Sequence, residues 1–288
     1  MNMKIKTGCI IVLYNPNIDL LKKVIDAILN QVDCLFIADN SLTVNHIFIN
    51  SLNKNIIYQK MIKNIGIAGA QNIGINYFTK NNYTHIIFLD QDSIIAKGLV
   101  KQLINDLAYL QNLSISVGGV SARAVNRQNG KMYHETKKRG KTFSEDLTEV
   151  NELMSSTSLI PIEMFSKVGL LEETLFIDGV DHEWCWRAKK IENSRFFVSE
   201  KAVISHQLGE GDKFFIIKNV AISTPFRTYY QYRNFFLLSR RNYVPLSWKF
   251  LNGFKYFVKL FYYPIFIPPR KKYINNIING VIDGFKYK

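Results

Sequence analysis

The stretch from Thr84 to Ser93, THIIFLDQDS, ends an apolar run with two carboxylates, Asp90 and Asp92, that are one residue apart. An apolar run of this length predicts a buried parallel strand, with both carboxylates at its carboxyl end. Open α/β sheets bind their ligands at that edge. Carboxylate oxygens are ligands for hard divalent cations, which often bridge protein carboxylates to substrate phosphates. The alternative is a solvated strand end, because D-x-D by itself is common by chance.

Two further runs that resemble strands also end on polar residues. The β-branched run at 7–14 ends at Tyr14 and Asn15, and the shorter run at 34–38 ends at Asp39. In a doubly wound sheet the carboxyl ends of such strands converge on one crevice. Three aligned polar ends therefore predict a site that could hold a nucleotide.

A glycine-containing stretch at 66–74 follows the strand expected at 56–58. It matches neither G-x-G-x-x-G nor G-x-x-x-x-G-K-[ST], which argues against a standard dinucleotide site and against a P-loop NTPase. Glycine allows a backbone to approach a ligand, or a helix to approach a sheet, more closely than other residues do. We expect close packing of that kind here.

A second polar cluster lies in the stretch FIDGVDHEWCWR at 176–187. A helix that begins near Asp181 would place Glu183 and Arg187 four residues apart on one face, as an ion pair. Asp181 in the first turn could point back into the crevice, or could serve only as an N-cap. His206 follows an expected strand, but a lone histidine is more often a surface or core residue than a ligand.

These residues must be positioned by alternating strands and helices. We expect strands at 7–14, 34–38, 56–58, 84–90, 115–124, 153–161 and 196–204, and helices at 17–30, 95–110, 162–168 and from about 181. The stretch 64–72 is expected to lead into a further helix that runs through Tyr77. The segment 126–150 is expected to be a polar excursion, with Lys137-Lys138-Arg139 in a solvated loop. Alternation with short loops predicts an α/β fold, an open and mostly parallel sheet covered by helices.

Charge and aromatic content divide the chain into two parts. Of the net charge of +14, most lies in residues 213–288, which carry 14 Lys and Arg, one Asp, and more than half of the aromatic side chains. We interpret this as chemistry in a nearly neutral body and attachment through the tail. Cys9, Cys34 and Cys185 share no metal-ligand spacing and are expected as reduced core thiols of a cytosolic protein. We expect neither a signal peptide, because the first apolar run is short, nor a clear transmembrane helix, because no uninterrupted run of 18 apolar residues occurs in the sequence.

The tail is expected to form basic helices. The first covers 224–241, and the second covers 246–269, with Lys249, Lys255 and Lys259 recurring along one side. A basic helix with large aromatic residues is typical of the membrane interface, and Arg270-Lys271-Lys272 would add attraction to anionic lipid. A helical cap on the sheet and a homodimer interface remain alternatives. Binding to nucleic acid is disfavoured because it leaves the acidic motifs of the body unexplained.

The motifs, taken in order, resemble one known family. They are VLYNP at 12–16, DNS at 39–41, NIGIAGAQNIGI at 64–75, FLDQDS at 88–93, LFIDGVDHEWCWRAK at 175–189, SHQLGEG at 205–211 and YYQYRNFFLL at 229–238. Each motif is short, but the ordered set, over roughly residues 8–240, resembles the inverting GT-A-type glycosyltransferases of family 2. The DQDS and FID-x-VD-x-EW forms are similar to those of bacterial rhamnosyltransferases that build surface polysaccharides.

The resemblance implies a role for each candidate residue. Donor binding would involve the nucleobase-contacting Asp39, its neighbours Tyr14 and Asn15, the pocket-shaping Asn64 and Asn72, and Asp90. Metal binding, with Mg²⁺ or Mn²⁺ on the donor diphosphate, would involve Asp92, Asp90 and His206. The general base that takes the proton from the acceptor hydroxyl would be Asp181.

Two positions depart from the family pattern. The usual Ser-Gly pair before the catalytic helix reads Ser156-Thr157, which puts the shape of the acceptor pocket in doubt. The acid usually found two residues before the base is Gly179 here. Asp178 is therefore the nearest rival to Asp181 as the base.

The resemblance also implies the domains and the reaction. Residues 1–212 would form the GT-A catalytic domain, with a donor half at about 1–93 and an acceptor half at about 94–212, and residues 213–288 a helical extension. The expected reaction moves L-rhamnose from dTDP-rhamnose to a hydroxyl of a lipid-linked glycan, such as an O-antigen precursor, at the inner face of the cell membrane. The alternatives are a UDP-hexose donor and a non-catalytic protein that binds sugar nucleotides or glycans.

Overall fold

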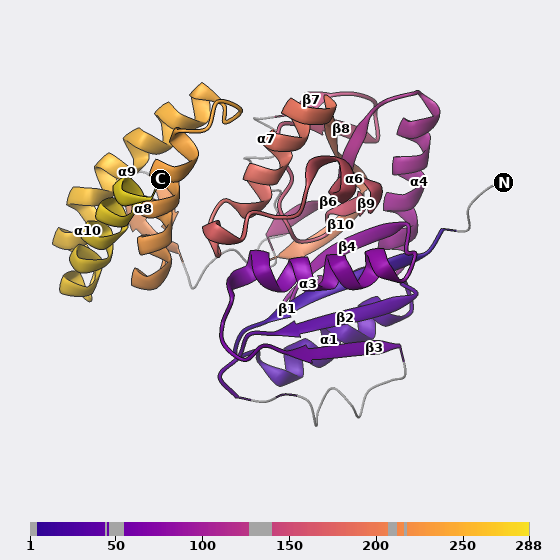
Figure 1. Cartoon of the computed structure of the whole chain (residues 1–288), viewed down its shortest axis with the longest axis horizontal. Helices are drawn as coiled ribbons and strands as arrows, with labels where there is room; N and C mark the ends of the chain where they lie inside the picture. Colours follow the sequence, from indigo (N-terminus) through magenta and orange to yellow (C-terminus); the bar gives the residue numbers. More distant parts are fainter. Residues whose placement is uncertain are drawn as a thin grey trace.

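A computed structural model describes residues 5–43, 45, 55–126, 140–206, 212–215 and 218–287, with the side chains of Asn126 and 205–221 outside the description. The Lys137-Lys138-Arg139 run falls outside the described residues. A mixed, mostly parallel sheet forms the centre of the molecule, with helices on both faces and three further helices to one side (Figure 1).

The sheet has the strand order β3-β2-β1-β4-β9-β6-β10-β8-β7, with β5 paired to β10. Strands β3, β2, β1 and β4 are mutually parallel, as are β6 and β10, whereas β9, β8, β7 and β5 pair in the antiparallel sense. The strands are β1 (Thr7–Leu13), β2 (Cys34–Asp39), β3 (Ile56–Lys60), β4 (His85–Asp90), β5 (Ile94–Ile95), β6 (Val117–Asn126), β7 (Lys141–Thr142), β8 (Leu147–Val150), β9 (Leu159–Pro161) and β10 (Arg195–His206). A separate hairpin joins β11 (Asp212–Phe215) to β12 (Lys218–Ala221).

Helices cover both faces of the sheet because successive side chains of its strands point to opposite sides. In β1, Cys9 and Ile11 pack on one side with α1 (Ile18–Leu29) and α4 (Leu99–Asn112). Ile10 packs on the other side with α3 (Gly66–Lys80), α6 (Glu163–Val168) and α7 (Val180–Glu192). A short 3₁₀ helix, η1 (Glu173–Leu175), precedes α7. The Asn17 side chain caps α1 by accepting a hydrogen bond from the Leu20 amide.

Three segments of the body differ from the sequence-based expectations. The helix expected from Ile95 begins at Leu99, because Ile94–Ile95 pairs with β10 and Gly98 adopts a left-handed conformation. The excursion expected at 126–150 contains β8, which pairs with the distant strand β10, and β7, which pairs with β8. The strand expected at 153–161 is reduced to β9, because the chain turns at 155–158, where the Ser158 amide donates to the Ser155 carbonyl.

The C-terminal helices are α8 (Pro225–Ser239), α9 (Leu246–Phe266) and α10 (Arg270–Lys286). They pack around a cluster of their own that consists mainly of tyrosines, namely Tyr232, Tyr256, Tyr263, Ile267, Tyr273 and Ile277. A Cβ added at Gly280 would lie 2.5 Å from the Tyr229 carbonyl oxygen, so glycine is needed for the close approach of α10 to α8. On the other side of α8, the Asn234 amide donates to the carbonyls of Leu175 and Asp178, at 2.8 Å each, and joins the extension to the body.

The lysines expected along one side of α9 differ in exposure. Lys259 is only 7% exposed and lies over the rings of Tyr256 and Tyr263. Lys249 donates a hydrogen bond to the Arg241 carbonyl. Among the described residues, none of the helices combines the length and the apolar character that a bilayer crossing requires.

Candidate active site

The polar strand ends come together as the sequence predicts. In the parallel register Leu13 is paired with Asp39 and Val12 with Asp90, so the carboxyl ends of β1, β2 and β4 share one edge. Gln91 joins two of these ends. Its amide accepts from the Tyr14 amide at 2.9 Å and donates to the Tyr14 carbonyl at 3.3 Å.

Asp39 is fully buried and accepts three hydrogen bonds. The Ser41 amide donates to Oδ1, and the Tyr58 hydroxyl and the Asn45 amide donate to Oδ2, at 2.8, 2.6 and 2.9 Å. Burial by itself raises the pKa of Asp39, but the hydrogen bonds from Ser41, Tyr58 and Asn45 outweigh it, so the pKa is lowered overall. The carboxylate is therefore ionised and fixed in place at the end of β2.

The segment after β2 organises the start of α3. The Asn40 side chain donates to the Gly66 carbonyl at 2.9 Å and accepts from the Ile65 amide at 3.2 Å. Asn64 accepts from the Gly66 amide at 2.9 Å. Asn15 accepts from the Leu42 amide through Oδ1. Asn15 and Asn64 thus both shape the backbone that borders the strand ends.

Asn72 faces away from this edge. It is 2% exposed and makes reciprocal hydrogen bonds with the backbone of Leu171, and it also donates to Glu173 Oε1 at 2.8 Å. These contacts tie α3 to the loop before α7. The Asn72 side chain thus holds α3 against the segment that leads to Asp181.

The D-x-D carboxylates differ in environment. Asp90 is half-buried at the end of β4, and its amide donates to Ser156 Oγ, whereas Asp92 is exposed. The register that pairs Ser205 with Ile94 carries the backbone of His206 toward Ser93, beside Asp92. The His206 side chain lies outside the description, and among the side chains that are described no group of three metal-ligating residues occurs. Two carboxylates at this edge fit a hard divalent cation, which takes oxygen ligands.

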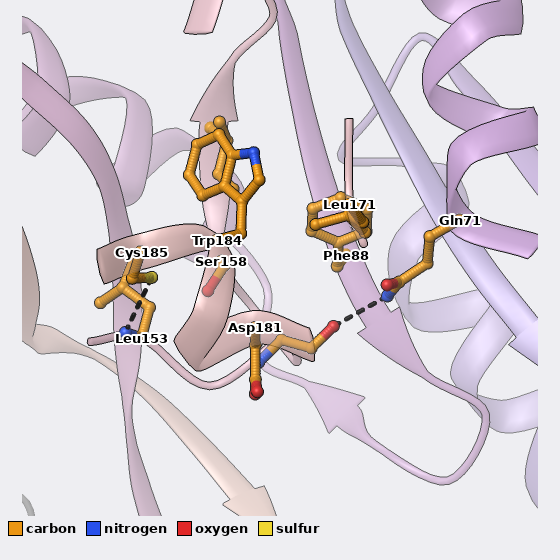
Figure 2. Close-up of a pocket in the computed structure, with 10 residues that line it drawn as sticks. Gln71, Phe88, Leu153, Ser158, Leu171, Asp181, Trp184 and Cys185 are labelled. Carbon is orange, nitrogen blue, oxygen red and sulfur yellow. Dashed lines mark hydrogen bonds between the residues drawn. The ribbon is translucent and has the colours of Figure 1, made fainter. Parts of the chain in front are cut away.

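Asp181 lies in the first turn of α7 and is held by backbone donors. Its Oδ1 accepts from the His182 amide at 2.9 Å, and its Oδ2 accepts from the Ser155 amide at 3.1 Å. The Ser155 hydroxyl in turn accepts from the Gln71 amide of α3 at 2.8 Å (Figure 2). Thus α3, whose start borders the strand ends, also contacts the segment that orients the Asp181 carboxylate.

A small, mostly apolar pocket lies beside Asp181 (Figure 2). Its walls include Gln71 and Phe88 on one side and Trp184 and Cys185 of α7 on another. Its volume of about 20 Å³ is enough for about one water molecule. The pocket is therefore too small to hold a sugar ring.

Glu183 and Arg187 form the expected ion pair, which is structural. Glu183 is fully buried, and its carboxylate contacts Arg187 Nε at 2.8 Å and accepts from the Tyr243 hydroxyl at 2.6 Å. Arg187 also donates to the carbonyls of Val168 and Leu170. The pair fixes α7, and with it Asp181, relative to the end of α6 and to the segment between α8 and α9.

The two departures from the family pattern have visible consequences. Thr157 has a φ of +67°, a left-handed conformation that glycine adopts without strain and a β-branched residue rarely adopts. Asp178, the rival base, forms an ion pair with Arg227 of α8 at 3.1 Å. The Asp178 carboxylate therefore faces the extension, whereas Asp181 is held by backbone donors on the side of Ser155.

Several residues that organise the site were not singled out in the sequence. Gln91 occupies the variable middle position of D-x-D, and Asn40, Gln71 and Ser155 act through contacts that cross between elements. All four are polar residues within or next to a quoted motif or a hydroxyl-rich run. Their sequence positions could suggest a role, but their partners follow only from the fold.

Comparison with known proteins identifies the family. Residues 9–169 match the model of the family described as Glycosyl transferase family 2. The chain is 32% identical over 247 residues to a dTDP-rhamnosyl transferase, RfbF, of Shigella flexneri, which covers 82% of this chain and 81% of RfbF.

Solved structures share the fold. TarS 1–349 of S. aureus, in complex with UDP-GlcNAc, aligns with a TM-score of 0.59 at 15% identity, over 96% of this chain and 82% of that one. GalNAc-T7 with UDP, GalNAc and Mn²⁺ aligns with a TM-score of 0.56 at 13% identity, over 93% of this chain and 59% of that one. With its acidic strand ends in a GT-A fold, and with a family match over more than half of its length, the chain belongs to glycosyl transferase family 2 and is a glycosyltransferase.

Proposed function

We propose that this glycosyltransferase moves L-rhamnose from dTDP-rhamnose to a hydroxyl of a lipid-linked glycan, in the synthesis of a cell-surface polysaccharide. The observation that carries the proposal is the 32% identity to the dTDP-rhamnosyl transferase RfbF, which extends over 82% of this chain and 81% of RfbF. The same donor is supported by the DQDS and FID-x-VD-x-EW forms of the two acidic motifs.

Asp181 is the proposed general base. Its carboxylate would take the proton of the acceptor hydroxyl while that oxygen attacks the anomeric carbon and the bond to the nucleoside diphosphate breaks. The product carries the inverted configuration, because a single displacement occurs from the face opposite the leaving group. Two backbone donors hold the Asp181 carboxylate in one orientation, which suits a base that must lie within hydrogen-bond reach of the acceptor.

Asp90 and Asp92 are the proposed ligands of Mg²⁺ or Mn²⁺, with His206 as a candidate third ligand. Such an ion, when bound with the donor, neutralises charge on the leaving diphosphate. Asp92 is exposed at the strand-end edge and so is accessible to a donor phosphate. Asp39, Tyr14 and Asn15, with the backbone shaped by Asn64, would form the nucleoside side of the same crevice.

A nucleotide-release assay tests the donor. Purified protein is supplied with Mn²⁺, the lipid fraction of the source organism as acceptor, and dTDP-rhamnose, dTDP-glucose, UDP-glucose or UDP-GlcNAc in turn. We expect release of dTDP from dTDP-rhamnose to be fastest. Faster release of UDP would favour a UDP-hexose donor, and binding of sugar nucleotides without any release would favour a non-catalytic binding protein.

We further propose that residues 213–288 attach the catalytic body to the inner face of the cell membrane, where a lipid-linked acceptor would lie. One face of α9 carries exposed apolar side chains at helical spacing, including Phe250, Phe254, Phe257 and Phe261, which are 75%, 72%, 60% and 55% exposed. The exposed cluster Arg270-Lys271-Lys272 follows immediately. The apolar side chains could be buried in the interface of a bilayer, and the basic residues beside them would be attracted to anionic lipid head groups.

Vesicle co-sedimentation tests this attachment. We expect binding to vesicles that contain phosphatidylglycerol, weaker binding to pure phosphatidylcholine, and loss of binding in Phe254→Ser/Phe257→Ser. The matched control is Ile191→Ser, which changes an exposed apolar residue of the body. If the wild-type protein ignores vesicles but sediments as a dimer that the double variant dissociates, the face of α9 is a homodimer interface instead.

A further inference from the structure

The turn that precedes Asp181 contains an unusual backbone conformation. Phe176 has φ of 65° and ψ of −62°, and the Ile177 amide donates to the Leu175 carbonyl at 2.7 Å across it. This is the positive-φ form of the γ-turn, which is rare and strained for a residue with a bulky side chain. Strain of this kind persists only where the surrounding structure enforces it, and it is concentrated at functional sites.

Contacts from two other regions enforce the conformation of Phe176. At the start of α3, the Ile67 amide donates to the Phe176 carbonyl at 2.7 Å. A Cβ at Gly66 would lie 2.5 Å from that carbonyl oxygen, so the approach requires glycine. From α8, the ring of Tyr230 stacks on the Phe176 ring with centroids 4.7 Å apart and planes within 9°. The turn thus positions an aromatic ring against the extension.

Phe226 completes an aromatic group at the same place. Its ring packs edge-on against Tyr230 at 5.1 Å and against Phe176 at 6.1 Å, yet 53% of the residue remains exposed. The adjacent Arg227 forms the ion pair with Asp178, and its side chain is also 53% exposed. An apolar ring and a guanidinium group are therefore exposed to solvent together, and the guanidinium is paired with Asp178, which lies three residues before Asp181 in the chain.

Sugar rings combine an apolar C–H face with hydroxyl groups at the rim, so they are bound by an aromatic face flanked by hydrogen-bonding groups. We propose that Phe226, supported by Tyr230 and Phe176, binds a sugar residue of the acceptor glycan, with Arg227 and Asp178 facing its hydroxyls. This subsite rests on the proposed function, because it assumes that Asp181 activates the acceptor. It assigns to α8 a direct role in acceptor recognition.

The test separates acceptor from donor kinetics. Transfer of radiolabelled rhamnose from dTDP-rhamnose is measured against the concentration of the lipid fraction of the source organism, for wild type, Phe226→Ala and Phe226→Trp. We expect Phe226→Ala to raise the acceptor concentration at half-maximal rate about tenfold, as loss of one aromatic contact predicts. The kcat of Phe226→Ala and its KM for dTDP-rhamnose should change less than about twofold. Phe226→Trp, which keeps an aromatic ring at this position, should bind the acceptor about as well as the wild type.

Tyr109→Ala serves as the control, because Tyr109 is an aromatic residue of α4 that is 50% exposed on the opposite face of the sheet. It should leave both KM values unchanged, and thermal unfolding should show that all variants are folded. An unchanged acceptor dependence in Phe226→Ala, or a change confined to the donor KM, would overturn the subsite. Absence of transfer in the wild type would instead overturn the proposed function.

Discussion

The crevice around Asp39 and the helical extension around Lys259 bury charged groups in different ways. Asp39 is fully buried but accepts hydrogen bonds from Ser41, Tyr58 and Asn45. Lys259 is 7% exposed, and no hydrogen bond to it is found among the described residues; its ammonium group lies over the rings of Tyr256 and Tyr263. The crevice fixes its charge with directed donors, whereas the extension surrounds its charge with aromatic rings.

The difference has an electrostatic consequence. A buried charge with several donors keeps its ionised form, while a buried charge without them shifts toward its neutral form. The pKa of Asp39 is accordingly lowered, because its hydrogen bonds outweigh its burial. The pKa of Lys259 is lowered to about 8, mainly because of burial and further by the nearby Lys255. A catalytic crevice needs fixed charges, whereas a packing or attachment surface does not.

The largest expected effect is that of changing Asp181, the proposed base. Asp181→Asn should lower the transfer rate by about 10²–10⁴-fold, because the amide cannot accept the acceptor proton. Donor affinity, measured by titration with dTDP-rhamnose, should stay nearly unchanged. The matched variant Asp178→Asn removes the ion pair with Arg227 and should reduce the rate far less. If the two variants show the reverse order, Asp178 is the base.

Asp39→Asn tests the directed donors of the crevice. An amide would present one N–H to a former donor, so we expect the free energy of unfolding to fall by about 1–3 kcal/mol and donor affinity to weaken. Urea unfolding at pH 7 measures the first effect. Because the folded-state pKa of Asp39 is lowered, its contribution is present at neutral pH and is lost as the pH falls through that pKa. The difference in the free energy of unfolding between wild type and variant should therefore shrink in acid. A difference that is independent of pH would contradict the lowered pKa of Asp39.

Lys259→Met should raise the free energy of unfolding at pH 7, whereas Asp39→Asn should lower it. At pH 7 the lysine is charged in both states, and the folded state bears the cost of burying it, so the methionine variant should be more stable by about 1–3 kcal/mol. Above pH 8 the folded lysine loses its proton first, and the stability of the wild type should rise relative to the variant until the unfolded lysine titrates as well. Urea unfolding at pH 7 and pH 9 measures the difference. A variant that is less stable at both pH values would show that the aromatic contacts dominate.

The smallest expected effect concerns Thr157, at the edge of the crevice. Thr157→Gly and Thr157→Ala both remove the hydroxyl that accepts from the Ala122 amide, but only glycine adopts a φ of +67° without strain. We expect the glycine variant to be more stable than the alanine variant by about 1 kcal/mol, the reverse of the usual order. Thermal unfolding compares the two. Equal stability would mean that the left-handed conformation is not strained.

Much of the site follows from local sequence signals. The alternation of strands and helices, the polar strand ends at Tyr14, Asp39 and Asp90, and the Glu183–Arg187 pair are confirmed. These features depend on hydrophobic periodicity and residue spacing, which can be read from each short segment of the sequence without knowledge of its tertiary contacts. The roles of Asp181, Asp92 and His206 as base and metal ligands stay predictions.

Tertiary contacts decided the remainder. The segment at 141–150 becomes two strands only because β10 offers an edge with which to pair, and Ile94–Ile95 joins the sheet for the same reason. Lys259 is on a helix as expected, but the packing of α9 against the tyrosine cluster determines that it is buried. The chemistry of each residue was set by its type. Which groups meet, such as Gln71 with Ser155 and Phe176 with Tyr230, depends on elements far apart in the chain, and only the folded structure brings them together.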